Sequence, residues 1–237
     1  MRLNLYIMKN LKLAAEYKKF RLNKLNTPEF SYLWLLLYWP FYGIVFFVLE
    51  RVLNLQYIDV YSRLDDYIPF CEYFIIPYYF WFAFLIGMLL YSLLFNIDTY
   101  RKYMMYIIIT YSITLVIYII FPTEQNLRPL TFERHNIFTI IASKLYNFDT
   151  NTNVCPSIHV IGSLAVCFAA WNDDNFSSFG WRFFFAVSTV LISMSTVFLK
   201  QHSIVDVFFA IILSAVCYPF VFGKRALRYC RYGRNKV

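Results

Sequence analysis

Two ionisable side chains stand four residues apart in one of the most apolar parts of the chain. His202 and Asp206 lie in the stretch STVFLKQHSIVDV, residues 195–207. On a helix this spacing places both side chains on one face, one turn apart. A carboxylate there can accept the proton of one imidazole nitrogen and leave the other nitrogen as a nucleophile or base. A buried ion pair that joins two helices fits the same spacing, so both interpretations stay open at this point.

A second histidine follows a proline in the stretch VCPSIHV. Pro156 disfavours a helix at Cys155 and suits the first turn of a new helix, so Ser157 and His159 are expected in that turn. The free backbone N–H groups at a helix start carry partial positive charge and can hold an anion. An ordinary helix start with a histidine at the membrane interface fits these residues as well.

Two cationic side chains accompany the histidines. Arg128 precedes Pro129 in FPTEQNLRPL, and Lys200 lies two residues before His202. A guanidinium suits two-pronged phosphate binding and an ammonium adds a point charge, although contact with lipid headgroups is an alternative for both. Two histidines and an aspartate could also ligate zinc, but the basic residues nearby would repel a cation. The set therefore predicts phosphoryl transfer through a phosphohistidine, without a metal or another cofactor.

Membrane helices are the elements expected to position these residues. Sixty per cent of the 237 residues are hydrophobic and the mean hydropathy is +0.51, whereas soluble domains are roughly 45–50% apolar. Several apolar runs reach the roughly 18–20 residues that cross a bilayer. The last two runs are nearly continuous, so a tight reversal near Lys200–His202 must separate them. We predict an all-α integral membrane bundle of six transmembrane helices, at residues 31–50, 70–95, 103–121, 157–171, 181–200 and 202–223.

Basic residues orient this bundle. The N-terminal segment 1–30 and the tail 224–237 flank one domain, 31–223, and carry 13 of the 22 lysines and arginines. The positive-inside rule places both ends in the cytoplasm, which requires an even number of spans. His135, His159 and His202 would then all lie at the outer face. Attraction to anionic lipid accounts for the basic ends more simply than nucleic-acid binding, which we do not expect.

Three short motifs in this order resemble the type 2 phosphatidic acid phosphatase superfamily of membrane phosphatases and phosphotransferases. That family has K-x6-R-P, then P-S-G-H, then S-R-x5-H-x3-D. Here the first motif retains only Arg128 and Pro129. The second is Pro156, Ser157, Ile158 and His159, and the third runs from Ser195 and Thr196 to His202 and Asp206. Motif order, spacing and the six predicted spans agree with the family across roughly residues 30–223.

Three positions depart from those motifs. Phe121, Ile158 and Thr196 stand where the family has lysine, glycine and arginine. Two cationic phosphate ligands are therefore missing, and Lys200, one helical turn after Thr196, is the candidate replacement. The pattern P-S-x-H is similar to the inositol phosphorylceramide synthase branch of the family. This similarity is an argument for headgroup transfer instead of plain hydrolysis.

The resemblance implies a role for each candidate residue. His202 would attack the phosphorus atom, Asp206 would orient His202, and His159 would protonate the leaving group and later activate the acceptor. The resemblance also implies that no metal is needed. The phosphate oxygens would contact four further residues: Arg128, Ser157, Lys200 and Ser195.

These inferences predict a lipid-phosphate phosphatase, which is a phosphoric monoester hydrolase, in a membrane that we expect to be the bacterial cell membrane. Its active site would face outside, and its partners would be the bilayer and a phosphorylated lipid such as phosphatidic acid. One alternative is a phosphotransferase that moves a phosphorylated headgroup to an alcohol. Two others are a lipid transporter or scramblase without catalysis, and a family member that has lost activity with its missing cations.

Overall fold

The computed structural model describes residues 21–53 and 55–223, so most of the two predicted basic segments lies outside the described residues. Seven α-helices form most of this part of the chain: α2 (Tyr38–Arg51), α3 (Ile75–Phe95), α4 (Ile97–Ile120), α5 (Ile137–Phe148), α6 (Ile158–Trp171), α7 (Phe179–Phe198) and α8 (Ile204–Phe222). Five short 3-10 helices accompany them: η1 (Leu22–Lys24), η2 (Ser31–Leu37), η3 (Arg63–Tyr67), η4 (Glu72–Phe74) and η5 (Asp174–Phe176). The chain is mostly helical, as predicted.

Five helical segments are long and apolar enough to cross a membrane: Ser31–Arg51, Glu72–Phe95, Ile97–Ile120, Phe179–Phe198 and Ile204–Phe222. They match five of the six predicted spans, but the third begins at Ile97, not at residue 103 as predicted. Arg101 and Lys102 had suggested a later start. They lie on the first two turns of α4, where a long cationic side chain can extend toward a polar boundary. The fourth predicted span corresponds to α6, which has 14 residues, fewer than the roughly 20 needed to cross alone.

Helix α6 lies at the centre of the bundle. It packs against α3, α4, α7 and α8, and ten of its 14 residues are buried. Small side chains let its neighbours approach closely. A Cβ atom on Gly162, for example, would lie only 2.6 Å from the Tyr111 hydroxyl. Because protein surrounds α6 on most sides, its apolar character reflects helix packing as much as contact with lipid.

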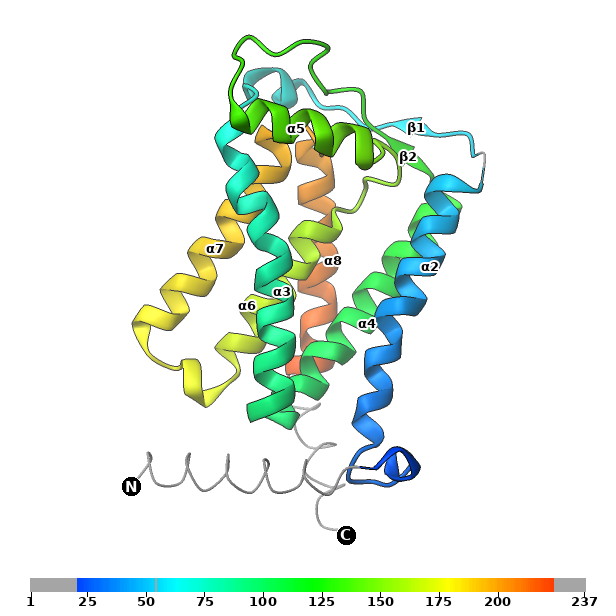
Figure 1. Cartoon of the computed structure of the whole chain (residues 1–237), viewed down its shortest axis with the longest axis vertical. Coiled ribbons are helices and arrows are strands. Elements are labelled where there is room, and N and C mark those ends of the chain that lie inside the picture. Colours follow the sequence, from blue (N-terminus) through cyan, green and yellow to red (C-terminus); the bar gives the residue numbers. More distant parts are fainter. Residues whose placement is uncertain (1–20, 54, 224–237) are drawn as a thin grey trace.

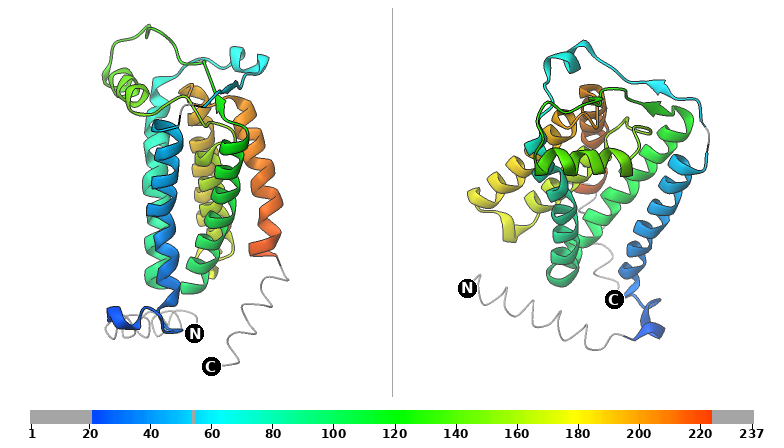
Figure 2. Two further views of the ribbon diagram at one scale, coloured as in Figure 1. Left: turned by 90° about the vertical axis from the view of Figure 1, so that its right-hand side faces the viewer. Right: turned by 45° about the horizontal axis from the view of Figure 1, so that its top comes forward.

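One end of the bundle, here called the loop-rich end, carries the connections 52–74, 121–157 and 199–203. There β1 (Ile58–Asp59) pairs in parallel with β2 (Thr123–Glu124), and α5 lies across the ends of the longer helices (Figures 1 and 2). The opposite end has the turn between α3 and α4 and the connection from α6 to α7, which contains η5. Polar loops are thus concentrated above one end of an apolar bundle.

The predicted tight reversal between the last two helices is confirmed. Helix α7 ends at Phe198 and α8 begins at Ile204. Lys200 adopts a left-handed conformation with φ 52°, and the N–H groups of Gln201 and His202 both donate to the Thr196 carbonyl, at 2.9 and 3.1 Å. His202 consequently precedes α8. The predicted span from residue 202 had wrongly placed it inside that helix.

Candidate active site at the start of α8

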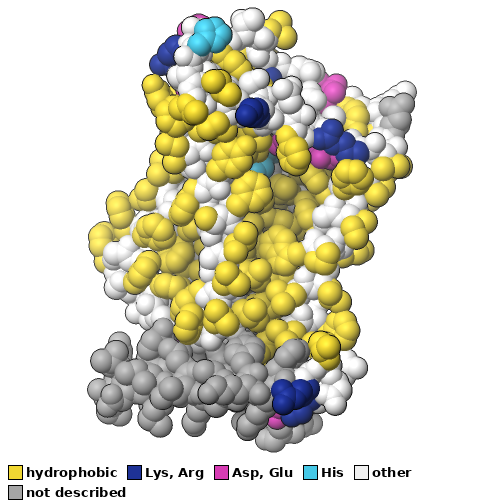
Figure 3. Space-filling view, in the orientation of Figure 1, with side chains coloured by type: hydrophobic (Ala, Val, Ile, Leu, Met, Phe, Trp, Pro, Cys, Tyr) yellow, Lys and Arg dark blue, Asp and Glu magenta, His cyan; other side chains and the backbone are white. Residues whose placement is uncertain are grey.

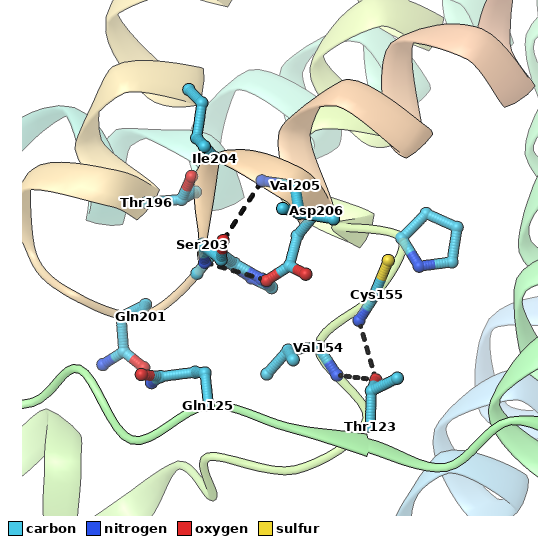
Figure 4. Close-up of polar contacts among 12 residues, drawn as sticks. Thr123, Gln125, Val154, Cys155, Thr196, Gln201, Ser203, Ile204, Val205 and Asp206 are labelled. Carbon is cyan, nitrogen blue, oxygen red and sulfur yellow. Dashed lines mark hydrogen bonds and ion pairs between the residues drawn. The ribbon is translucent and has the colours of Figure 1, made fainter. Parts of the chain in front are cut away.

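The N-terminus of α8 holds His202 against Asp206. Ser203 is the N-cap residue: its Oγ accepts from the Val205 N–H at 3.2 Å, and its own N–H donates to Asp206 Oδ2 at 3.0 Å (Figure 4). The same carboxylate oxygen lies 3.1 Å from Nδ1 of His202. A carboxylate can only accept, so Nδ1 carries the proton and Nε2 keeps a lone pair. The pair therefore meets through a capping box, not through two positions on one helix face.

Asp65 in η3 fixes this helix start from the neighbouring loop. Its side chain is 1% exposed. Oδ1 accepts from the Ile204 N–H at 2.8 Å, and Oδ2 accepts from the Ser203 hydroxyl at 2.6 Å. A carboxylate in this position also complements the positive end of the helix dipole. The sequence interpretation missed Asp65, because its local signal, a capping box with Ser62, says nothing about a partner 138 residues away.

His159 faces the His202–Asp206 pair from the first turn of α6. Its ring packs against Tyr78 and Trp81, with centroid distances of 4.7 and 4.4 Å, and its centroid lies 5.6 Å from that of His202. Its Nδ1 atom is buried without a hydrogen-bond partner. The structure thus brings together the three residues that the sequence predicted as catalytic.

A cavity of about 310 Å³ opens beside the two histidines. In Figure 3, side chains of histidine, of acidic residues and of lysine or arginine are visible in the upper part of the molecule, above a mostly hydrophobic surface. The size is at the lower end of the range for small-molecule sites. Seven aromatic residues contribute to its wall: Phe46, Tyr78, Tyr79, Trp81, Phe82, Tyr118 and Phe148. Its polar lining, besides the histidines, consists of Glu50, Asp149, Thr150, Thr152, Asn153 and Gln201.

Arg128 lies behind the cavity wall and not in it. Its guanidinium donates to three backbone carbonyls, those of Tyr146 (3.1 Å), Asp149 (2.9 Å) and Thr150 (2.7 Å), and to the side-chain oxygen of Gln201 at 2.5 Å. Burial lowers the pKa of Arg128, and the carboxylate of Asp149 opposes that shift. The predicted phosphate ligand is therefore a clamp that holds the chain after α5 against the α7–α8 reversal.

Lys200 points to a different part of the loop-rich end. Its Nζ donates to the Asp65 carbonyl at 2.8 Å, and it lines a separate pocket with Asp59, Asp65 and Asp66. Burial lowers the pKa of the Lys200 ammonium, and the two nearest of these carboxylates oppose the shift. The structure does not bring Lys200 to the histidines, which corrects its predicted role as the replacement phosphate ligand.

The two predicted serines also lie outside the cavity lining. The Ser195 hydroxyl donates to the Ile192 carbonyl at 2.6 Å inside α7, so it is a helix contact and not a phosphate ligand. Ser157 is the N-cap residue of α6, and its N–H donates to the Asp206 carbonyl at 3.2 Å. That bond ties the helix that carries His159 to the helix that carries Asp206.

Two amide side chains that sequence reasoning missed line the cavity instead. Asn153 and Gln201 are each 3% exposed. Both amide atoms of Asn153 and the Nε2 atom of Gln201 lack a hydrogen-bond partner among the residues that the structure describes. Asn153 also adopts a left-handed conformation with φ 53°, which asparagine tolerates better than most residues. Unpaired buried amides are costly, so these two side chains are candidate ligand contacts.

Comparisons of the chain with protein-family models, with curated proteins and with solved structures give no match. The resemblance described above therefore rests on the motif residues alone. Of these, the structure unites His159, His202 and Asp206. None of the four predicted phosphate ligands, Arg128, Ser157, Lys200 and Ser195, lines the cavity beside them.

Proposed function

We propose that this protein is a membrane enzyme that cleaves a phosphate ester of a lipid through a covalent intermediate on His202. The observation that carries the proposal is the 3.1 Å contact between His202 Nδ1 and Asp206 at the edge of a cavity. Asp206 fixes the tautomer of His202 and stabilises the positive charge that forms when Nε2 attacks. His159, 5.6 Å away between ring centroids, exchanges a proton with the substrate in this proposal.

The reaction proceeds in two balanced steps. In the first, Nε2 of His202 bonds to phosphorus, the bond from phosphorus to the lipid oxygen breaks, and His159 gives a proton to that oxygen. In the second, His159 takes a proton from an incoming hydroxyl, the hydroxyl oxygen bonds to phosphorus, and the bond to His202 breaks. With water as acceptor the outcome is hydrolysis, and with an alcohol it is headgroup transfer.

The charge of the cavity favours transfer from a phosphodiester over hydrolysis of a phosphate monoester. Of the described residues that line it, none is a lysine or arginine, and two, Glu50 and Asp149, are acidic. A monoester carries close to two negative charges at neutral pH, and no cationic side chain among the described lining residues would contact them. A diester carries one, which neutral amides such as Asn153 and Gln201 can solvate. Hydrolysis of a monoester, the first prediction from the sequence, becomes the second candidate.

Lipid access fits the same site. The cavity wall includes Phe46 of α2 and Tyr79 and Phe82 of α3, and the two α3 residues are more than 40% exposed. An acyl chain could therefore remain in the bilayer while the headgroup enters between α2 and α3. In this proposal α6 completes six crossings, both chain ends face the cytoplasm, and the histidines lie at the outer face.

The test is a trapping experiment with the full chain in detergent and EDTA. Phospholipids labelled with ³²P in the headgroup phosphate are added, the reaction is quenched in base, and acid-labile label on the protein is measured. We expect label on the wild type, none on His202→Ala, and a labelled new lipid when diacylglycerol or ceramide is supplied. If neither label nor product forms with any lipid, the enzyme proposal is wrong, and lipid movement between leaflets should then be measured.

A further inference from the structure

Two carboxylates face the cavity with few partners. Glu50 near the end of α2 accepts one hydrogen bond, from the Thr150 hydroxyl at 2.8 Å. The Asp149 side chain, just after α5, accepts one from the Tyr78 hydroxyl at 3.3 Å. Each carboxylate has room for about four donors. Both are half-buried, so their remaining capacity is open to water or to a ligand. They converge on one cavity from parts of the chain that are far apart in the sequence.

The neighbouring cations do not enter that space. The terminal nitrogens of Arg128 donate hydrogen bonds to three backbone carbonyls and to the side-chain oxygen of Gln201. Arg51 is exposed and donates to the Phe148 carbonyl at the rim. Burial raises the pKa of Asp149, and the guanidinium of Arg128 only partly opposes that shift. A cation supplied from outside would satisfy both carboxylates better than the protein does.

Aromatic faces surround the same space. Tyr78 and Trp81 pack around His159, and Phe46, Tyr118 and Phe148 complete the wall. Aromatic rings attract a cation through their electron-rich faces, most strongly when the cation is poorly hydrated, as a quaternary ammonium is. Carboxylates and rings together form a better environment for an alkylammonium than for a phosphate or a polyol.

We infer that the cavity binds a phospholipid headgroup that carries an ammonium, with the positive group between Glu50 and Asp149 and the phosphodiester at the histidines. This inference rests on the proposed function in one respect: the phosphodiester is placed at the histidines because His202 is proposed to attack it. The buried unpaired amides of Asn153 and Gln201 supply neutral donors beside His202 for the phosphate oxygens. The headgroup class is thus a zwitterionic phosphodiester, such as a phosphocholine or phosphoethanolamine ester.

A pair of lipids that differ only in charge tests this inference. Dioleoyl phosphatidylcholine is compared with its analogue in which a 3,3-dimethylbutyl group replaces choline, so that carbon replaces the nitrogen and the shape stays the same. Binding is measured on the full-length His202→Ala protein in detergent micelles, as the shift in Tm with lipid concentration. This readout requires no turnover, so it is independent of the proposed chemistry. We expect the choline lipid to bind about tenfold or more tightly.

Three variants assign the preference to the two carboxylates. Glu50→Gln and Asp149→Asn should each reduce the choline preference several-fold, whereas Glu133→Gln, which removes an exposed charge from the same end of the molecule, should not. Equal binding of the two lipids to the parent protein overturns the inference, even if the variants fail to fold. Stronger binding of dioleoyl phosphatidic acid than of the choline lipid overturns it as well. Preference without turnover in the wild-type protein would uphold the inference and defeat the proposed enzyme.

Discussion

Carboxylates at the two ends of the bundle differ in how many hydrogen bonds the protein gives them. At the opposite end, Asp173 receives hydrogen bonds from the Asn96 amide (2.7 Å), the Thr99 hydroxyl (2.7 Å), the Tyr91 hydroxyl (3.4 Å) and the Asn175 N–H (2.9 Å). These donors tie α3 and α4 to the loop between α6 and α7. Asp173 is 3% exposed and has its bonding capacity filled by the protein itself.

At the loop-rich end, by contrast, the side chains of Glu50 and Asp149 each have one hydrogen bond and line a cavity. Glu50 and Asp149 are half-buried, so they differ from Asp173 both in burial and in the number of donors that the protein supplies. A saturated carboxylate holds the fold together, and an unsaturated one beside a cavity and two histidines is available for a ligand.

The largest expected effect comes from His202 itself. His202→Ala should lower turnover about a thousandfold or more, because the nucleophile is lost. Stability should change little, because the backbone bonds of the reversal and the Ser203–Asp206 contact remain. Turnover per folded protein and Tm are measured together. Retained turnover would show that the loop-rich end is a structural network like the one around Asp173.

The opposite pattern is expected for Asp173. Asp173→Ala should reduce the free energy of unfolding by about 2–4 kcal/mol, because three side-chain donors lose their acceptor inside the protein. The folded fraction should keep the wild-type kcat/KM and the wild-type choline preference. Asp174→Ala, at the exposed neighbouring position, is the matched control. A change in headgroup preference on Asp173→Ala would contradict the proposed division between the two ends.

Variants of Arg128 test whether its contacts between the two loops contribute to stability alone or also to turnover. Arg128→Met should reduce the free energy of unfolding by about 2–3 kcal/mol, because four acceptors lose a charged donor. KM for the lipid should rise only to the extent that the loss of Arg128 displaces Gln201 and Asp149 from the cavity wall. Arg128→Lys should restore little of the lost stability, since an ammonium cannot reach all of the same carbonyls at once. Full rescue of turnover by lysine would restore the predicted role of Arg128 as a phosphate ligand.

Lys200 is expected to matter less. Lys200→Ala should reduce the free energy of unfolding by about 1 kcal/mol, the value of one hydrogen bond to a carbonyl. Turnover should stay within a few-fold of the wild type, because the ammonium lies in another pocket. Steady-state rates and Tm check both statements. Near-complete loss of turnover with an unchanged Tm would return Lys200 to the list of phosphate ligands.

The sequence predicted most of the helices and the proximity of His159, His202 and Asp206, but not the cavity. Apolar runs mark membrane helices whatever their partners are, and the spacing of His202 and Asp206 is local. The roles of Lys200 and Arg128 as phosphate ligands stay predictions. Neither side chain lines the cavity beside the histidines, because the direction of a side chain in a loop depends on distant backbone. Asp149 carries no local pattern, since it shares a cavity with His202 only when α5 lies across the bundle (Figure 1).

The pH dependence of headgroup choice is the smallest effect and depends on Asp149. Burial raises the pKa of the Asp149 carboxyl, while Arg128, His202, Arg51 and the hydrogen bond from Tyr78 lower it. Glu50 lies close enough to interact with Asp149 as well. Because the net shift is upward, the empty protein should gain stability as pH falls through the folded pKa of Asp149. Tm of the wild type and of Asp149→Asn against pH checks this sign.

A bound ammonium should oppose that trend, because it favours the ionised carboxylate. As pH falls from neutral, the choline lipid should therefore lose its advantage over the dimethylbutyl lipid by a few-fold, and Asp149→Asn should show a weaker dependence. The ratio of kcat/KM for the two lipids is the quantity to follow, since effects common to both lipids cancel in it. A ratio that is flat in pH for the wild type would separate Asp149 from headgroup recognition and leave Glu50 as the carboxylate that binds the ammonium.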